Sequence, residues 1–244
     1  MKLLLVQYRT DASKEHEQAC LLRYAGLDVA ELVIVNPLLD PGVLKRVRLD
    51  QFDAMAIGGS GEFQIPTMPD DVAQSLETVR PLIDRAIETD IPVLGMCFGH
   101  QILAWHFGIL VVTDPEQSQV GSYPVHLTDE GRADPLFADL PTEFIAQHGH
   151  KDSIMGLPAG AVHLAMGKKH AYNAFRIGSA YGLQFHPELG REDLMARLAL
   201  YPEYLKGKSL DDVRLQFTES PEAPRILANF MAIVRARVNT AVIA

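Results

Sequence analysis

The chain has 244 residues, of which 48% are hydrophobic and 22% charged, a balance typical of a globular protein with a sizeable core. Its net charge of −9 argues against nucleic acid or an anionic membrane surface as the main partner, because both require a basic face. Only two cysteines are present, Cys20 and Cys97, so we expect no disulfide framework and a reducing, cytoplasmic location. The apolar run Leu3–Val6 is too short for a signal peptide, and no apolar stretch approaches the length of a membrane span.

The first half of the chain alternates short apolar runs with longer helical patterns. We predict strands over Lys2–Gln7, Asp28–Val35, Phe52–Ile57 and Ile91–Met96, and helices over Ser13–Ala25, Asp70–Thr89 and Phe98–Phe107. Pro81 lies inside the second helix and predicts a kink or a division into two shorter helices. The alternation of strand and helix predicts an α/β fold, with a parallel sheet covered by helices on both faces.

The second half of the chain has a different pattern, in which short apolar runs are separated by turns. We predict strands over Gly121–Leu127, Glu143–Gln147, Val162–Met166, Ala171–Ile177 and Tyr181–Phe185, which suggest a mixed or antiparallel extension of the sheet. From Arg191 onward the pattern is helical, apart from loops around Pro202 and Ser220–Pro224. No repeat or linker is visible, so we predict a single domain over 1–244, with a core over 1–189 and a helical C-terminal segment over 190–244.

The strongest local motif surrounds Cys97. An apolar strand runs into Gly-x-Cys-x-Gly, and a helical pattern follows at once, which matches the spacing of a nucleophile elbow. Such a tight turn needs small neighbours, and Gly95 and Gly99 supply them. The start of the helix favours a thiolate, and the backbone N–H of Phe98 points into the same space, where it can hold an oxyanion. The alternative is a buried structural cysteine, which is also our interpretation of Cys20.

A thiolate nucleophile needs a base and a group that orients the base. His186 follows an apolar strand at Tyr181–Phe185 and precedes Pro187 and Glu188. Glu188 can accept the Nδ1 proton of His186, although His-Pro-Glu is also compatible with an ordinary turn.

The other histidines give weaker signals. His148 and His150 resemble a metal-binding pair, but no further ligands of suitable spacing accompany them, so we expect no metal and interpret this segment as a loop that lines a substrate pocket. His100 and His106 lie on the helix that follows Cys97, where the default interpretation is a solvent or core position.

The two motifs together resemble a known family. Gly-Met-Cys97-Phe-Gly-His-Gln101, followed by Gly-Leu-Gln-Phe-His186-Pro-Glu188, is similar to the class I glutamine amidotransferase domain, the type found in GMP synthase. The resemblance covers roughly residues 1–189. It implies a flavodoxin-like, doubly wound sheet with Cys97, His186 and Glu188 as a catalytic triad.

The resemblance also implies further site residues. A glycine-rich loop after the third strand supplies the second oxyanion N–H in the family, and here this role falls on Gly59, although proline usually stands where this chain has Ser60. A plain strand-to-helix turn is the alternative, and the loop lacks the Lys-Ser/Thr of a phosphate-binding loop. Gln101 matches a family glutamine that contacts the amino-acid end of the substrate. His148 and its neighbours match a loop that holds the α-carboxylate and α-amino groups through backbone atoms.

The resemblance implies hydrolysis of the γ-amide of glutamine through a thioester on Cys97, without a metal or organic cofactor. Because no ATP-binding domain is visible, ammonia would pass to a separate synthetase subunit. One alternative is a stand-alone γ-glutamyl peptide or amide hydrolase, since the helical C-terminal segment resembles the extension of γ-glutamyl peptidases of the same superfamily. A non-catalytic regulatory or binding module is a second alternative. A cysteine peptidase of the same sheet type is a third, but it would place histidine where Phe98 stands.

Overall fold

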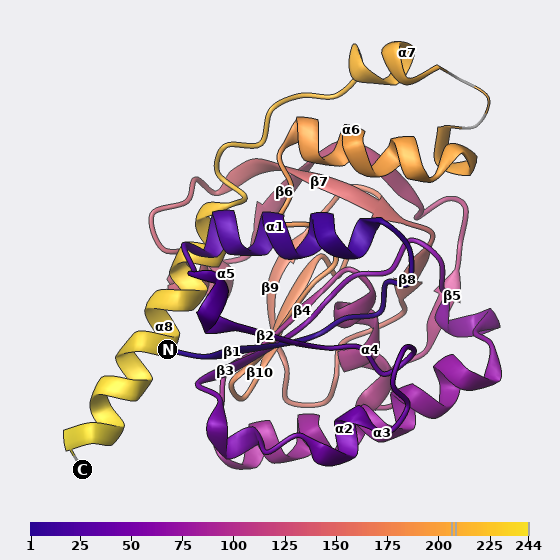
Figure 1. The fold of residues 1–244 in the computed structure, drawn as a ribbon. Helices are drawn as coiled ribbons and strands as arrows, with labels where there is room; N and C mark the ends of the chain where they lie inside the picture. The colour runs from indigo at the N-terminus through magenta and orange to yellow at the C-terminus, as the bar shows by residue number, and fades with distance from the viewer. Residues whose placement is uncertain (206, 208, 244) are drawn as a thin grey trace.

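A central sheet runs through the computed structural model, which describes residues 1–205, 207 and 209–243 (Figure 1). Its strands in the described residues are β1 (Leu3–Val6), β2 (Leu32–Val35), β3 (Ala54–Ile57), β4 (Val93–Met96), β6 (Gln119–Leu127), β7 (Glu143–His150), β9 (Val162–Met166), β10 (Ala174–Ile177) and β11 (Ala180–Leu183). They lie in the order β2-β1-β3-β4-β11-β10-β9-β6-β7. A separate small sheet pairs β5 (Val111–Thr113) with β8 (Asp152–Ile154).

One part of the central sheet is parallel and the other antiparallel. β1 pairs in parallel with β2 and β3, and β4 pairs in parallel with β3 and β11. From β11 to β7 the neighbouring strands are antiparallel. The order β2-β1-β3-β4-β11 is that of flavodoxin-like doubly wound sheets. The predicted fold class, with its antiparallel extension, is therefore confirmed.

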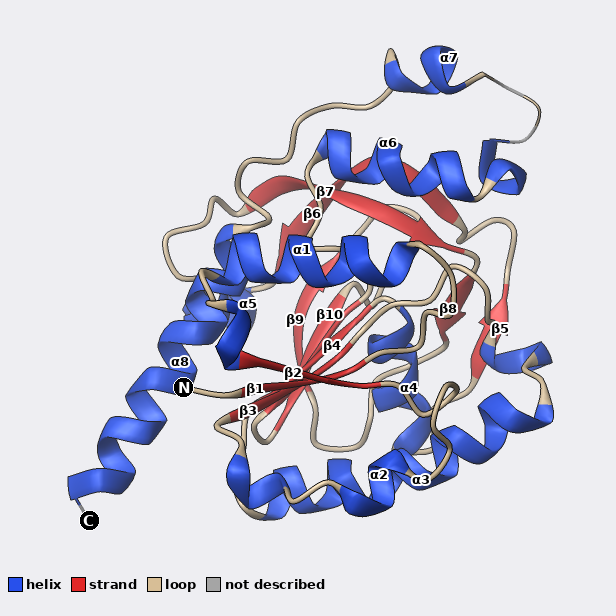
Figure 2. Cartoon of the chain, viewed as in Figure 1, coloured by secondary structure: helices blue, strands red, loops and turns tan. Residues whose placement is uncertain are grey.

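Helices cover both faces of the sheet (Figure 2). They are α1 (Ser13–Ala25), α2 (Val43–Arg46), α3 (Asp70–Glu88), α4 (Phe98–His106), α5 (Asp129–Ala133), α6 (Arg191–Leu200), α7 (Leu210–Arg214) and α8 (Arg225–Ile243), with a 3₁₀ turn η5 (Pro202–Leu205) after α6. α1 and α8 share a core with Leu3 and Leu5 of β1, whereas α3 and α4 share the other core with Leu4 and Val6. Burial on both faces explains why this strand is a continuous apolar run. None of the described helices is long and apolar enough to cross a membrane.

The predicted division into two helices at Pro81 is wrong, because α3 continues through Pro81 as one helix. The alternative that we predicted, a kink at this position, stays a prediction. Proline removes one backbone hydrogen bond, but Val79, Leu82 and Ile83 on either side of it are buried against the sheet. Their burial holds the chain in the helical path across the missing bond. The strands β5 and β8 and the short helices α2 and α5 were not predicted, since three to five residues are too few to show a periodic pattern.

The C-terminal segment joins the body of the protein through α8. Ile226, Phe230 and Val234 of this helix lie in the same buried cluster as residues of β1, α1 and the antiparallel strands. Arg237 adds a hydrogen bond from Nη2 to the carbonyl of Thr89 at 2.8 Å. The segment is therefore largely helical, as predicted, and it completes one face of the sheet.

We predict that Phe230→Ala lowers the free energy of unfolding by about 3–5 kcal/mol, because the ring is 1% exposed and its loss leaves a cavity between α8 and the sheet. Urea denaturation followed by circular dichroism measures the change. Leu215→Ala is the control, since Leu215 is 90% exposed and its loss should change stability by no more than about 0.5 kcal/mol. Equal stabilities for the two variants would show that α8 is not part of the folded core.

Candidate active site

Strand β4 runs into a tight turn at Cys97, and α4 starts at the next residue. Cys97 has a φ of 52° and a ψ of −101°, a conformation that residues with a side chain rarely adopt. A Cβ atom on Gly99 would lie 2.1 Å from the carbonyl oxygen of Ile57, and one on Gly95 would lie 2.5 Å from the oxygen of Gly99. The turn therefore needs both glycines, as the motif indicates, and backbone strain of this kind is concentrated at functional sites.

His186 lies just beyond β11, the parallel neighbour of β4. Its backbone N–H donates to the carbonyl of Gln147 at 2.9 Å, which ties this segment to β7. Its Nδ1 donates to Glu188 Oε1 at 2.8 Å, and both side chains are buried. Because β4 and β11 run in the same direction, their carboxyl ends bring Cys97 and His186 to one edge of the sheet.

Cys97 and His186 both lie next to Gly59 and Gly149. The Cys97 sulfur lies 3.9 Å from the carbonyl oxygen of Gly149 and 3.8 Å from Gln184 Nε2. A Cβ atom on Gly149 would lie 3.8 Å from His186 Nε2, and one on Gly59 would lie 3.1 Å from His186 Cε1 and 3.7 Å from Cys97 Cβ. The structure thus brings together the three side chains that the sequence proposes as a triad.

The charges of the site hold a proton on the histidine. Burial by itself lowers the pKa of His186, but the charges and hydrogen bonds of Glu188 and Cys97 outweigh burial and raise that pKa above its ordinary value. Burial by itself raises the pKa of Glu188, but the attraction of His186 and Arg197 outweighs burial, so the pKa of Glu188 lies below its ordinary value. An ionised carboxylate behind a protonated imidazole suits a group that donates a proton next to a thiol.

A second buried ion pair lies beside the glycine-rich loop. Arg9 Nε lies 3.0 Å from Glu17 Oε1, and neither side chain is more than 2% exposed. Glu17 Oε1 also accepts the N–H of Gly59 at 3.0 Å. In this structure a carboxylate thus engages the N–H that we assigned to an oxyanion, and the role predicted for Gly59 stays a prediction. The N–H of Phe98 lies at the first position of α4, where it has no acceptor within the helix.

The two predicted substrate-binding residues lie in different surroundings. Gln101 lines a cavity beside Cys97, where its Nε2 donates to the carbonyl of Asp152 at 3.0 Å and to Gln184 Oε1 at 3.2 Å. His148 does not line that cavity, and its ring instead lies beside the rings of Tyr123 and Phe185.

The neighbours of His148 are better placed. Gly149, His150, Lys151 and Asp152 all line the cavity beside Cys97. The prediction that this segment is a loop is wrong, because Gly149 and His150 belong to β7 and Asp152 to β8. A contact of these residues with substrate stays a prediction.

The space around the candidate triad is narrow. A cavity of about 30 Å³ adjoins His186 and another of about 10 Å³ adjoins Cys97, and Tyr204 of η5 lines both. Tyr204 donates from its hydroxyl to the carbonyl of Gly61 at 3.3 Å, and Lys151 Nζ lies 4.3 Å from the centre of its ring. Small-molecule pockets usually measure roughly 300 Å³ or more, so the space beside Cys97 in this structure is smaller than a typical substrate pocket.

Several residues of the site were not identified from the sequence. They are Arg9, Glu17, Arg197 and Tyr204, which come from the end of β1, from α1, from α6 and from η5. Charged residues in helical patterns are usually solvated, so burial of Glu17 and Arg197 had no local signal. Arg9 had a weak signal, since it follows a predicted strand at the carboxyl edge of the sheet.

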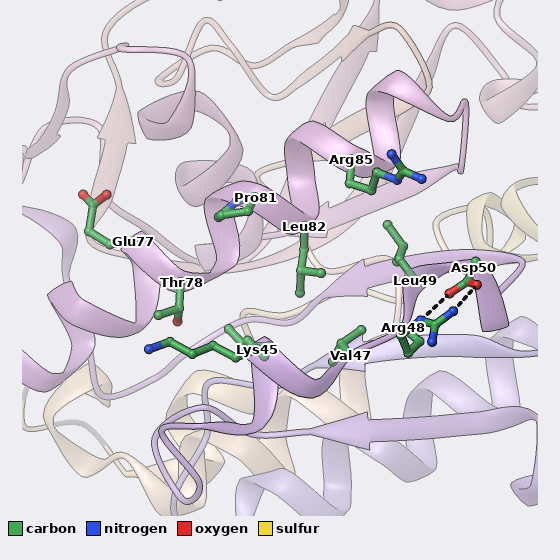
Figure 3. A pocket seen from close by; sticks show the side chains of 11 residues that line it. Lys45, Val47, Arg48, Leu49, Asp50, Glu77, Thr78, Pro81, Leu82 and Arg85 are labelled. Carbon is green, nitrogen blue, oxygen red and sulfur yellow. Dashed lines mark hydrogen bonds and ion pairs between the residues drawn. The ribbon is translucent and has the colours of Figure 1, made fainter.

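A much larger hollow, of about 720 Å³, lies between α2 and α3 and contains no candidate triad residue (Figure 3). Its wall carries Lys45, Glu77 and Arg85, and an ion pair joins Arg48 to Asp50 at 2.9 Å. The lining carries the basic side chains Lys45, Arg48 and Arg85 and the acidic side chains Asp50 and Glu77, so it does not favour one charge of ligand.

One group among the described residues offers donors of the kind that hold metals. His16, Cys20 and Asp193 each place one such atom within 4.8 Å of the others. Asp193 already accepts from Tyr24 and pairs with Arg23, while the guanidinium of Arg197 donates to His16 Nδ1 at 3.2 Å. Cations therefore flank the group, and the arrangement suits a hydrogen-bonded network better than a metal ion.

Comparison with known proteins identifies relatives of this chain. The family model described as glutamine amidotransferase class-I matches residues 59–196. The GMP synthase [glutamine-hydrolyzing] of Thermosipho africanus is 37% identical over 108 residues, which cover 43% of this chain and 20% of that protein. One subunit of the GMP synthase [glutamine-hydrolyzing] of Methanocaldococcus jannaschii is 29% identical over 120 residues, which cover 48% of this chain and 62% of that protein. The chain thus spans less than two thirds of either relative.

Solved structures share the fold across nearly the whole chain. A glutamine amidotransferase from Thermotoga maritima has a TM-score of 0.73 at 20% identity, covering 96% of this chain and 97% of its own. A glutamine amidotransferase from Methylobacillus flagellatus has a TM-score of 0.69 at 19% identity, covering 95% of this chain and 94% of its own. Since the family model matches more than half of the residues, the chain belongs to the class I glutamine amidotransferase family. The resemblance noted in the sequence is confirmed.

We predict that Gly99→Ala lowers stability by about 1–3 kcal/mol and slows alkylation of Cys97 by iodoacetamide, because the added methyl group forces α4 away from Ile57. Thermal unfolding and mass spectrometry of the Cys97 peptide measure the two effects. Gly156→Ala is the matched control, since a Cβ atom there meets nothing within 4 Å. Identical behaviour of the two variants would contradict the close packing of the elbow.

Glu188→Gln tests the ion pair through its dependence on pH. The folded pKa of His186 is raised, so its attraction to Glu188 stabilises the fold fully below the unfolded histidine pKa and is lost as pH rises through the folded pKa. We expect the stability difference between wild type and Glu188→Gln to be larger near pH 6 than near pH 10, as measured by urea denaturation. Glu219→Gln, which breaks an exposed ion pair, is the control, and its stability should differ little from that of wild type at either pH. A difference for Glu188→Gln that does not change with pH would contradict the pairing.

Proposed function

We propose that this chain hydrolyses the γ-amide of glutamine with Cys97 as nucleophile, His186 as proton donor and base, and Glu188 as the residue that orients the histidine. The observation that carries the proposal is the position of Cys97 at a strained strand-to-helix turn beside a buried His186–Glu188 pair. Family membership supports chemistry on the glutamine amide in general.

In the proposed reaction the Cys97 sulfur attacks the γ-carbonyl carbon, and the C–N bond then breaks as His186 gives its proton to the leaving nitrogen. Ammonia departs, and a γ-glutamyl thioester remains on the sulfur. Water then attacks this thioester while His186 takes one of its protons, and glutamate leaves as the sulfur is released. Each residue returns to its starting state, and the reaction requires no oxidant or metal.

The proposal uses the N–H of Phe98 to stabilise the oxyanion. This N–H belongs to the first residue of α4, so the helix leaves it without an acceptor and its dipole favours negative charge there. The N–H of Gly59 is bound to Glu17 and has no part in the mechanism as we propose it.

The dimensions of the site support a small amide as substrate. The cavities beside Cys97 and His186 are about 10 and 30 Å³, and Tyr204 borders both. Because both spaces are narrow, the proposal takes glutamine, the smaller of the two candidate substrates, in preference to a γ-glutamyl peptide.

We propose that the released ammonia passes to a separate synthetase subunit. The relative from Methanocaldococcus jannaschii is named as one subunit of a GMP synthase, which supports a glutaminase that works with another chain. The molecule that accepts the ammonia depends on which synthetase binds this chain. Co-purification of the chain from its own cell would identify that synthetase.

We predict that Cys97→Ala reduces glutamate release from glutamine by at least about 10³-fold, because the nucleophile is lost while the turn accepts a smaller side chain. An enzymatic glutamate assay measures the rate. Cys20→Ala is the matched control and should retain activity, since Cys20 packs in a separate cluster between α1 and α6. Full activity of Cys97→Ala would disprove the mechanism. If the wild-type protein released glutamate from γ-glutamyl peptides but not from glutamine, the proposed substrate would change from glutamine to a γ-glutamyl peptide.

A further inference from the structure

Behind the candidate triad lies a buried arginine that the family match does not reach, since that match ends at residue 196. Arg197 of α6 is 4% exposed, and its Nη1 lies 3.3 Å from Glu188 Oε1. The same oxygen accepts the Nδ1 proton of His186 at 2.8 Å. One carboxylate oxygen is therefore shared between an imidazole and a guanidinium.

The position of Arg197 is determined by a second contact. Its Nε donates to His16 Nδ1 at 3.2 Å, so the guanidinium bridges α1 and the triad. Packing adds to this, because the neighbouring Leu194 and Leu198 of α6 lie in a buried cluster with Cys20. A guanidinium bonded on two sides has little freedom to leave Glu188.

The energetic cost of this arrangement points to a role beyond stability. Burying two charges costs several kcal/mol per ion, and well-packed apolar residues often replace buried ion pairs without loss of stability. Arg9 is a further buried cation nearby and opposes Arg197 electrostatically.

We infer that Arg197 is a positioning residue, which holds the Glu188 carboxylate in place and weakens its pull on the His186 proton. This inference rests on the proposed function. Without Arg197 the carboxylate would act on His186 alone, and the imidazole would keep its proton more tightly. With Arg197 the negative charge is shared, so His186 can release its proton to the leaving nitrogen.

Other ionisable groups also face this set of charges. The groups that interact with His186 or Glu188 are Arg9 beyond β1, Cys20 of α1, Cys97 at the elbow, and His148 and His150 of β7. Burial lowers the pKa of His148 and His150 well below neutral, so these two stay uncharged. Among these three histidines, His186 is therefore the one whose charge is expected to change near pH 7 and above.

The test compares Arg197→Gln with wild type. Glutamine keeps a hydrogen-bond donor for Glu188 but removes the charge, so we expect the alkaline limb of kcat/KM for glutamine hydrolysis to move up by about one pH unit. The C–H resonance of the His186 ring, followed by NMR in histidine-labelled protein, should titrate higher by the same amount. Arg197→Lys is expected to lie between the two, because it keeps the charge but cannot bond His16 and Glu188 at once.

Arg191→Gln is the matched control, since it removes a partly exposed arginine from the same helix and should leave both titrations unchanged. Lower activity of Arg197→Gln with unchanged pH limits would reduce Arg197 to a structural role and overturn the inference. If Arg197→Gln does not fold, Arg197→Met carries the test, because it removes the charge from a side chain of similar length, and titrations identical to wild type would overturn the inference. A shifted His186 resonance in a protein that does not hydrolyse glutamine would support the inference while rejecting the proposed function.

Discussion

The parallel pairing of β4 with β11 is the constraint on which the site depends. In this register Gly95 lies opposite Gly182 and Met96 opposite Leu183, and the N–H of Cys97 continues the ladder to the carbonyl of Leu183 at 2.8 Å. Residues that are far apart in the chain therefore leave the sheet at the same edge. A shift of one residue in this pairing would turn every side chain of β11 to the opposite face.

The site is completed by charge in a region from which water is nearly excluded. Arg9 and Glu17 form one buried pair, and Arg197 with Glu188 forms another, next to His186. Buried pairs of this kind contribute little to stability, but removal of one partner is costly because it leaves an unpaired charge. The four charges thus restrain the glycine-rich loop through Glu17 and the histidine through Glu188. The C-terminal segment contributes to the site, since Arg197 comes from α6 and Tyr204 from the turn that follows α6.

Much of the fold could be predicted because apolar periodicity is a local property. The helix over Ser13–Ala25 and the strand over Val162–Met166 have the predicted bounds. The predicted division of α3 at Pro81 was wrong, because burial on both sides of a proline outweighs one missing hydrogen bond. The candidate triad was accessible because its residues lie in two short motifs, whereas the engagement of Gly59 by Glu17 was not, since it joins a loop to a distant helix.

The sequence alone determined the strand-to-helix turn at Cys97, because the small residues that permit it are neighbours in the chain. It also determined the pairing of His186 with Glu188, whose side chains lie two positions apart. Only the tertiary structure decided that Arg197 lies behind Glu188 and that Tyr204 borders the cavities beside Cys97. Burial and the approach of distant charges depend on how helices pack on the sheet, and no local pattern of residues specifies that packing.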